Sequence, residues 1–131
     1  MRAASRLLAI AAVAAALTAC DKAPAAPDAV LDGWKKAGLQ VSAFTAAQGA
    51  GLGGGTCQSG TINVVDVTLC HYADEKAAKA AEEAGLATVG DATGVSIAQG
   101  KMLLVVADRR KADPSGKTID QVTKVFRGRQ K

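Results

Sequence analysis

The chain of 131 residues has few of the side chains on which most protein chemistry depends. It contains one histidine and three cysteines, and aromatic residues make up only 3% of it. His71 has no serine or cysteine nucleophile in an elbow motif near it, so no hydrolase triad is indicated. The aromatic residues lie outside any basic run, which argues against binding of nucleic acid; they are Trp34, Phe44, Tyr72 and Phe126.

Two glycine-containing segments look like phosphate-binding loops but lack the required context. The run Gly49–Gly55 is expected to lie between two strands, whereas a dinucleotide-binding loop leads into a helix. Gly116–Thr118 reads Gly-Lys-Thr, but a Walker A loop needs a glycine five residues earlier, where this chain has Lys111. We therefore expect no nucleotide site and no cofactor.

The carboxylates offer no better catalytic candidate. Asp66, Asp74 and Asp108 could converge at one end of a sheet. However, Asp74 is better explained as a helix N-cap, and Asp108 as the end of a strand beside two arginines. We expect no metal site and no enzymatic activity.

The N-terminus contains the layout of a secretory signal. Arg2 and Arg6 precede the apolar run Leu7–Ala16, which is too short to span a bilayer core of ~30 Å as a helix. The next four residues resemble the lipobox of bacterial lipoproteins; they are Leu17, Thr18, Ala19 and Cys20. The resemblance implies cleavage before Cys20, diacylation of its thiol and acylation of the new amino terminus. An ordinary secretory signal with an unrelated cysteine, or a membrane-spanning anchor, is the alternative.

The lipobox resemblance also predicts a domain organisation. Residues 1–19 form the signal peptide, 20–29 the lipidated N-terminus with a Pro/Ala tether, 30–127 one domain, and 128–131 a basic tail. The mature chain is expected on the periplasmic side of a cell-envelope membrane. Asp21 resembles the residue that retains enterobacterial lipoproteins in the inner membrane, so the resemblance favours the inner membrane.

Basic residues are concentrated near the C-terminus. Residues 109–131 carry eight Lys or Arg and two acidic residues, whereas residues 21–108 carry six and ten. A basic side chain beside anionic headgroups contributes roughly 1 kcal/mol. The candidates for such contact are Arg109, Arg110, Lys111, Arg127 and Arg129. The alternative is that a solvated helix and a frayed tail are simply rich in Lys and Arg.

The hydrophobic pattern predicts an α+β fold with a small antiparallel sheet of about four to five strands built from hairpins, and three helices packed on it. The helices are expected to begin at the caps Asp28, Asp74 and Asp113, with Pro114 in the first helical position of the last. Gly85 is expected to end the second helix, which would bury Ala77, Ala80, Ala81 and Ala84.

Alternation predicts a strand over residues 39–47 and two hairpins. The second hairpin is expected to turn at Gln99–Gly100, with Met102–Ala107 as the most buried strand. The phrase DVTLCHYADEKAAKAAEEAG, followed by GKMLLVVADR and a closing helix, resembles a group of small uncharacterised bacterial envelope lipoproteins over about residues 30–127. That resemblance implies a fold and an envelope location, and no activity.

The first hairpin places two cysteines opposite one another. If it turns around Asn63–Val64, opposed residues have numbers that add to 127, and Cys57 faces Cys70. Because Val64 disfavours positive φ, we expect a four-residue turn of the same register. Outside the cytoplasm two such thiols oxidise, and the bond contributes about 3 kcal/mol. His71 points to the other face, and a C-x-x-C motif is absent, which disfavours a metal site or a catalytic redox pair.

The sequence therefore predicts a lipid-anchored, non-enzymatic envelope protein whose domain contacts another envelope protein. The alternative is a small-ligand binding lipoprotein that uses the glycine-rich loop 49–55 as a lid.

Overall fold

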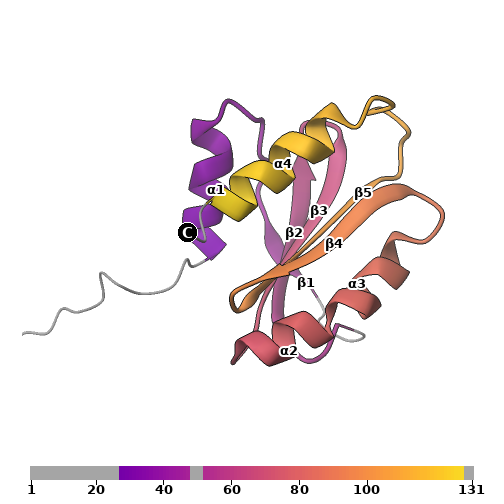
Figure 1. Cartoon of the computed structure of the whole chain (residues 1–131). Coiled ribbons are helices and arrows are strands. Elements are labelled where there is room, and N and C mark those ends of the chain that lie inside the picture. The colour runs from indigo at the N-terminus through magenta and orange to yellow at the C-terminus, as the bar shows by residue number, and fades with distance from the viewer. Residues whose placement is uncertain (1–26, 48–51, 129–131) are drawn as a thin grey trace, which may run out of the picture.

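The computed structural model describes residues 27–47 and 52–128 of the chain. They form an α+β domain with one antiparallel sheet of five strands in the order β1-β2-β3-β5-β4, as the sequence predicts (Figure 1). The strands are β1 (Thr45–Ala47), β2 (Thr56–Ile62), β3 (Val65–His71), β4 (Thr93–Gln99) and β5 (Met102–Asp108). The helices are α1 (Pro27–Lys36), α2 (Glu75–Ala80), α3 (Glu82–Val89) and α4 (Lys117–Gly128).

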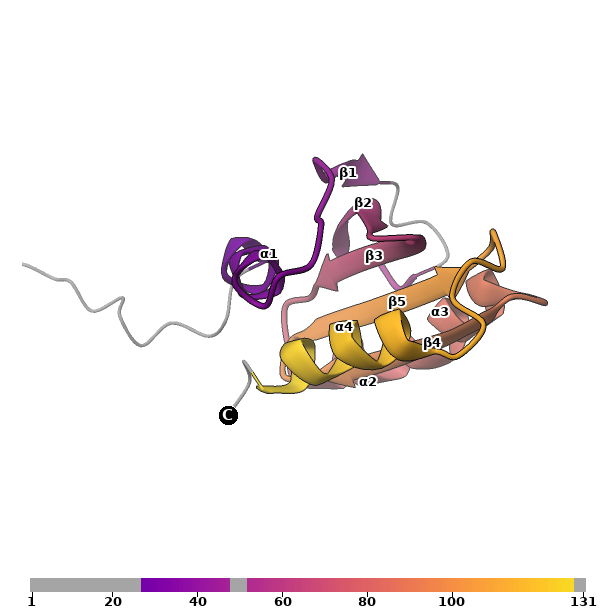
Figure 2. The same cartoon turned by 90° about the horizontal axis from the view of Figure 1, so that it is seen from above.

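The sheet is covered on both faces. Helices α1 and α4 lie on one face, and α2 and α3 on the other, so the domain has three layers (Figures 1 and 2). Strand β5 lies between β3 and β4 and is buried at every residue. An interior strand with both faces covered reads as a continuous apolar run rather than an alternation, which explains the sequence MLLVVA.

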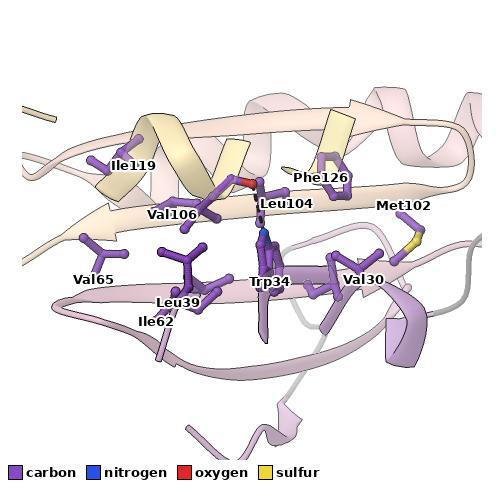
Figure 3. Close-up of a cluster of buried hydrophobic side chains, with 13 residues drawn as sticks. Val30, Trp34, Leu39, Ile62, Val65, Met102, Leu104, Val106, Ile119 and Phe126 are labelled. Atoms are coloured by element: carbon purple, nitrogen blue, oxygen red, sulfur yellow. Dashed lines mark hydrogen bonds between the residues drawn. The ribbon is translucent and has the colours of Figure 1, made fainter. Parts of the chain in front are cut away.

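The larger core lies between the sheet and the helices α1 and α4. Trp34 on α1 is fully buried at its centre, and its indole Nε1 donates a hydrogen bond to the backbone oxygen of Val122 at 2.9 Å (Figure 3). The ring also stacks on Phe44 with 6.3 Å between centroids. Trp34 therefore joins α1 to α4 and to the sheet. The other fully buried large side chains of this core include Val30, Ile62, Leu69, Leu104 and Phe126.

The smaller core, under α2 and α3, is built mainly from small side chains. The buried helix positions are Ala78, Ala81, Gly85 and Val89. The expectation that Ala80 is buried is wrong, because the helix presents the neighbouring stripe and leaves Ala80 exposed. Alanines occupy so much of this helix that the sequence does not distinguish its buried stripe from the next one.

Gly85 does not end its helix. The helix turns at Ala81, continues through Gly85 and ends at Val89, with Gly90 at φ 62° as its C-cap. A Cβ atom at Gly85 would lie 2.4 Å from Ser96 Oγ and 2.9 Å from Val105 Cγ2. Gly85 is therefore needed because α3 approaches β4 and β5 closely. It lies within the helix and does not act as a C-cap.

Replacing Gly85 by alanine is expected to lower the free energy of unfolding by about 1–3 kcal/mol, because the added methyl group overpacks this contact. Chemical denaturation followed by circular dichroism measures the loss. Gly128→Ala is the control, since its Cβ would meet nothing within 4 Å. If both variants unfold at the same denaturant concentration, α3 does not lie as close to the sheet as described.

The strand expected over residues 39–47 is shorter. Val41 makes an isolated bridge to Ile62, and β1 pairs only over Thr45–Ala47. The register shifts by one residue between the two pairings, which is a β-bulge. Ser42 holds the bulge: its N–H donates to the Thr61 oxygen at 2.9 Å, and its Oγ accepts from the Thr61 N–H at 2.8 Å.

The turns and one helix start also differ from expectation. The first hairpin makes the tight turn, with Ile62 paired to Val65, because Asn63 takes the positive φ (52°) and Val64 does not. The second hairpin turns at Gly100–Lys101, one residue later than expected, since Gln99 still pairs with Met102. Helix α4 begins at Lys117 rather than Pro114, because a turn with Gly116 at φ 75° intervenes.

Helix α1 begins at Pro27, so residues 27–29, expected in the tether, are already helical. Proline fits the first turn of a helix because no intrahelical partner exists there for a backbone N–H.

Candidate functional site

The sheet has two ends, and different elements lie at each. We call the end where α1 begins the anchor end; it includes Pro27, His71, the Gly100–Lys101 turn and Arg127. The opposite end, the distal end, includes the Asn63–Val64 turn and the loop from Arg109 to Asp113. Gln99 links α4 to the anchor end, because its Nε2 donates to the Arg127 oxygen at 3.2 Å.

Cys57 and Cys70 form the disulfide that the hairpin register predicts. They are directly paired in β2 and β3, with Cα atoms 4.0 Å apart. Both residues are buried in the smaller core beneath α2. Val65, Val67 and Leu69 lie in the larger core on the other face, because successive strand residues point to opposite faces. The disulfide therefore joins two strands inside a core, with Cys57 4% exposed and Cys70 fully buried.

His71 lies beside the disulfide in sequence but pairs with Thr56 at the strand end. It lines an open cleft of about 460 Å³ at the anchor end, together with Pro27 and Asp28 of α1. Within residues 27–47 and 52–128, no group of three His, Cys, Asp or Glu residues lies close enough to hold a metal ion. This cleft adjoins the point where the predicted tether meets the domain.

The described part of the glycine-rich loop, residues 52–55, is fixed to the smaller core. Leu52 is buried, and its backbone oxygen accepts a hydrogen bond from the Tyr72 hydroxyl. A Cβ atom at Gly55 would lie 2.6 Å from the Tyr72 ring, so the backbone lies directly against that ring. Residues 49–51 of the predicted lid lie outside the described residues. Residues 52–55 therefore cover the smaller core.

Replacing Tyr72 by phenylalanine is expected to lower the free energy of unfolding by about 1–2 kcal/mol, because the buried Leu52 oxygen loses its donor. Burial raises the pKa of the Tyr72 phenol. Its stabilising contribution is therefore complete below pH ~10 and is lost as pH rises through the folded-state pKa. Denaturation at neutral pH measures the first effect.

Tyr72 is the chain's one tyrosine, so phenolate absorbance of the wild-type protein reports on this group alone. Phenolate should appear at higher pH in the folded protein than in denaturant. Equal titration curves in both states, together with unchanged stability of Tyr72→Phe, would contradict the buried hydrogen bond.

The basic residues predicted to contact lipid lie at two separate places. Arg109 and Arg110 are at the distal end, where both approach the carboxylate of Asp66, at 3.8 Å and 3.1 Å. Arg109 also donates to the Thr88 and Val89 oxygens at the C-terminal end of α3, where a cation is favourable. Lys111 is exposed in the same loop. Arg127 is at the anchor end, and Arg129 lies outside the described residues.

An open cleft of about 610 Å³ lies at the distal end, lined by Asp91, Arg109, Lys111 and the buried Asp108 and Asp113. The Asp108 carboxylate accepts the N–H groups of Ala112 and Asp113 at 2.9 Å. Asp113 accepts those of Thr118 and Ile119, at 3.1 and 3.0 Å. These two carboxylates hold the loop and begin α4, so their geometry indicates a structural role.

The carboxylates considered as a converging set are divided between the two ends. Asp66 and Asp108 are at the distal end, whereas Asp74 follows β3 at the anchor end and accepts the Ala77 N–H at 2.7 Å. Asp74 is thus the helix cap that the sequence predicts. The sequence did not identify Asp66 as the partner of both Arg109 and Arg110. The signal that could have found it is the pairing of β3 with β5, which brings Asp66 beside the end of the strand that the two arginines follow.

Glu82 is a second residue that sequence reading missed. Its Oε2 accepts the Ala98 N–H at 2.7 Å. This hydrogen bond is the main cause that lowers the pKa of the Glu82 carboxyl, and the neighbouring Lys79 lowers it further. The contribution of Glu82 to stability is present above the unfolded pKa and is lost as pH falls through the folded one. Glu82 lies outside the alanine stripe expected to be buried, so the sequence gives no sign of this contact.

Comparison with protein-family models, curated proteins and solved structures finds no match for this chain. Among the residues that the structure describes, no helix is both long and apolar enough to cross a membrane.

Proposed function

We propose that the chain is a lipid-anchored, non-enzymatic envelope protein whose α+β domain contacts another envelope protein. The observation that carries the proposal is the buried disulfide between Cys57 and Cys70. Such bonds form and persist in oxidising compartments outside the cytoplasm. An export signal with a lipobox at Leu17–Cys20 would deliver the chain to such a compartment, so two independent parts of the sequence agree.

The position of α1 gives the proposal an orientation. Residues 20–26 span at most about 25 Å when extended, and they join the domain at Pro27, at the anchor end. The anchor end would therefore face the lipid, with Arg127 and the tail residue Arg129 available to anionic headgroups. The distal end, with Lys111 and the 610 Å³ cleft, would face away and is the surface proposed for the protein partner.

Intact mass of the full chain, expressed in a bacterium and taken from membranes, tests the anchoring. The expected mass is that of residues 20–131 plus acyl groups, and Cys57 and Cys70 should resist alkylation until a reductant is added. Cys20→Ala should abolish acylation and leave the disulfide intact. A soluble chain that keeps residues 1–19 would overturn the proposed location.

Crosslinking in intact envelopes tests the partner surface. Lys111→Glu at the distal end should weaken capture of a specific crosslinked protein, whereas Lys101→Glu at the anchor end is the matched control. No specific product with the wild-type chain, or equal loss with both variants, would count against the distal end as the contact surface.

A further inference from the structure

Strand β4 is an open edge of the sheet that lacks the usual protection. It is the last strand in the sheet order and has helices α4 and α3 on its two sides (Figure 1). Its seven residues, Thr93–Gln99, include no charged residue and no proline. Edge strands of this length normally carry such residues, because an unprotected edge can pair with another strand.

The outward-facing backbone groups of β4 follow from one hydrogen bond. In an antiparallel pair, alternate residues direct their N–H and C=O groups away from the neighbouring strand. The Ala98 N–H bonds to Glu82 instead of β5, so Ala98 belongs to the outward set, and by alternation so do Ser96 and Gly94. Within residues 27–47 and 52–128, we find no acceptor for the N–H groups of Gly94 and Ser96.

An exposed apolar side chain lies on the edge side of α3. Glu82 reaches the outer edge of β4, and Leu86 follows it by four residues, which places Leu86 on the same side of the helix. Leu86 is 55% exposed, the most exposed of the large apolar side chains in the described part of the chain. Because Gly85 packs against both Ser96 and Val105, α3 lies over β4 and β5 together; it occupies the edge at Ala98 through Glu82 and leaves the N–H groups of Gly94 and Ser96 open.

We propose that β4 pairs with β4 of a second copy of this chain, antiparallel, about a two-fold axis at Val95. Gly94 of each copy would then face Ser96 of the other, which satisfies both free N–H groups. Glu82 favours this register, since pairing centred on Ser96 would require Ala98 to release it. Leu86 of each copy would lie near the axis and meet its counterpart. A symmetric contact of this kind buries the same surface on both copies.

The occupant is a second copy because the edge is self-complementary around Val95. The free N–H groups of Gly94 and Ser96 lie symmetrically on either side of Val95. The side chain of Leu86 on α3 lies near the same level of the strand. Helix α3 reaches β4 near Ala98 through Glu82 and near Gly94 through Val89, so Leu86 falls between them. The inference is independent of lipid anchoring and is tested on purified protein.

A cysteine at Val95 tests the register directly. In the proposed pairing the two Val95 residues are opposed, with Cα atoms about 4.5 Å apart, within range of a disulfide. The full chain carrying Cys20→Ser and Val95→Cys, purified in detergent and mildly oxidised, should give a linked dimer on non-reducing gels. Ile97→Cys is the matched control, because the two Ile97 residues would be offset by four positions, about 13 Å. Absence of the Val95 link, or equal links at both positions, overturns the proposal.

A second variant tests the contact without an introduced thiol. Leu86→Lys places two like charges near the axis, yet within one copy Lys would pair favourably with Glu82 one turn earlier. Sedimentation should show a dimer for the wild-type chain and a monomer for Leu86→Lys. At low protein concentration the two chains should begin to unfold at the same temperature. A wild-type monomer at every concentration, or a Leu86→Lys dimer as stable as the wild type, would show that this edge does not pair.

Discussion

Replacing Trp34 by alanine is expected to lower the free energy of unfolding by about 3–5 kcal/mol. The side chain is fully buried, stacks on Phe44 and donates to the Val122 oxygen, so one residue joins α1, the sheet and α4. Its removal leaves a cavity where these three elements meet. Denaturation followed by circular dichroism measures the loss, since Trp34 is the chain's only tryptophan and the variant has no indole fluorescence.

Trp34→Phe separates the two contributions. Phenylalanine keeps a ring in the core but cannot donate to Val122, so its loss should be smaller than that of alanine. A Trp34→Ala variant that unfolds within about 1 kcal/mol of the wild type would show that the larger core does not depend on this contact.

Replacing Cys57 and Cys70 together by alanine is expected to lower the free energy of unfolding by about 3 kcal/mol. The disulfide closes a loop with a sequence separation of 13 residues, so it restricts the unfolded chain. For a domain whose net stability is about 5–15 kcal/mol, that is a large share. Comparison of denaturation curves of the oxidised wild type and the double variant measures it.

Reduction of the wild type provides the control for this prediction. The reduced protein should unfold near the double variant, because both lack the covalent link while the strands keep their pairing. If reduction has no effect on the unfolding midpoint but the double variant is destabilised, the loss comes from packing of the sulfur atoms in the core.

The parts of this fold that sequence predicts are those set by local patterns of apolar residues. Opposed residue numbers in one hairpin place Cys57 opposite Cys70, and the alternation of Val65, Val67 and Leu69 assigns the two faces. The apolar run in β5 identifies a strand buried on both sides. In the hairpin a period of two residues carries the information, and in β5 an uninterrupted apolar run carries it; neither needs a distant contact.

The features that sequence reading missed depend on contacts between distant elements. Gly85 looks like a helix end, yet glycine is needed there because Ser96 and Val105 of the sheet leave no room for a side chain. Glu82 looks solvated, yet it accepts the Ala98 N–H. Asp113 was expected to cap a helix at the next residue, but it accepts N–H groups five and six residues later. Intrinsic propensity cannot anticipate these cases, since tertiary contacts override it.

The candidate site shows the same division. Sequence composition identifies a basic C-terminal segment, but it cannot show that Asp66 engages Arg109 and Arg110, or that Arg127 lies at the opposite end of the sheet. A cluster defined by sequence proximity thus becomes two surfaces with different neighbours.

The sheet order also has a consequence for the rate of folding. Strands β2 and β3 form one hairpin and β4 and β5 another, each with contacts close in sequence. The pairing of β3 with β5 joins them and brings together residues such as Asp66 and Ala107, across α2, α3 and β4. Because closing that long intervening segment costs entropy before its contacts form, central docking of the two hairpins should limit the folding rate. Substitutions at the β3–β5 boundary should therefore slow folding more than those in either turn.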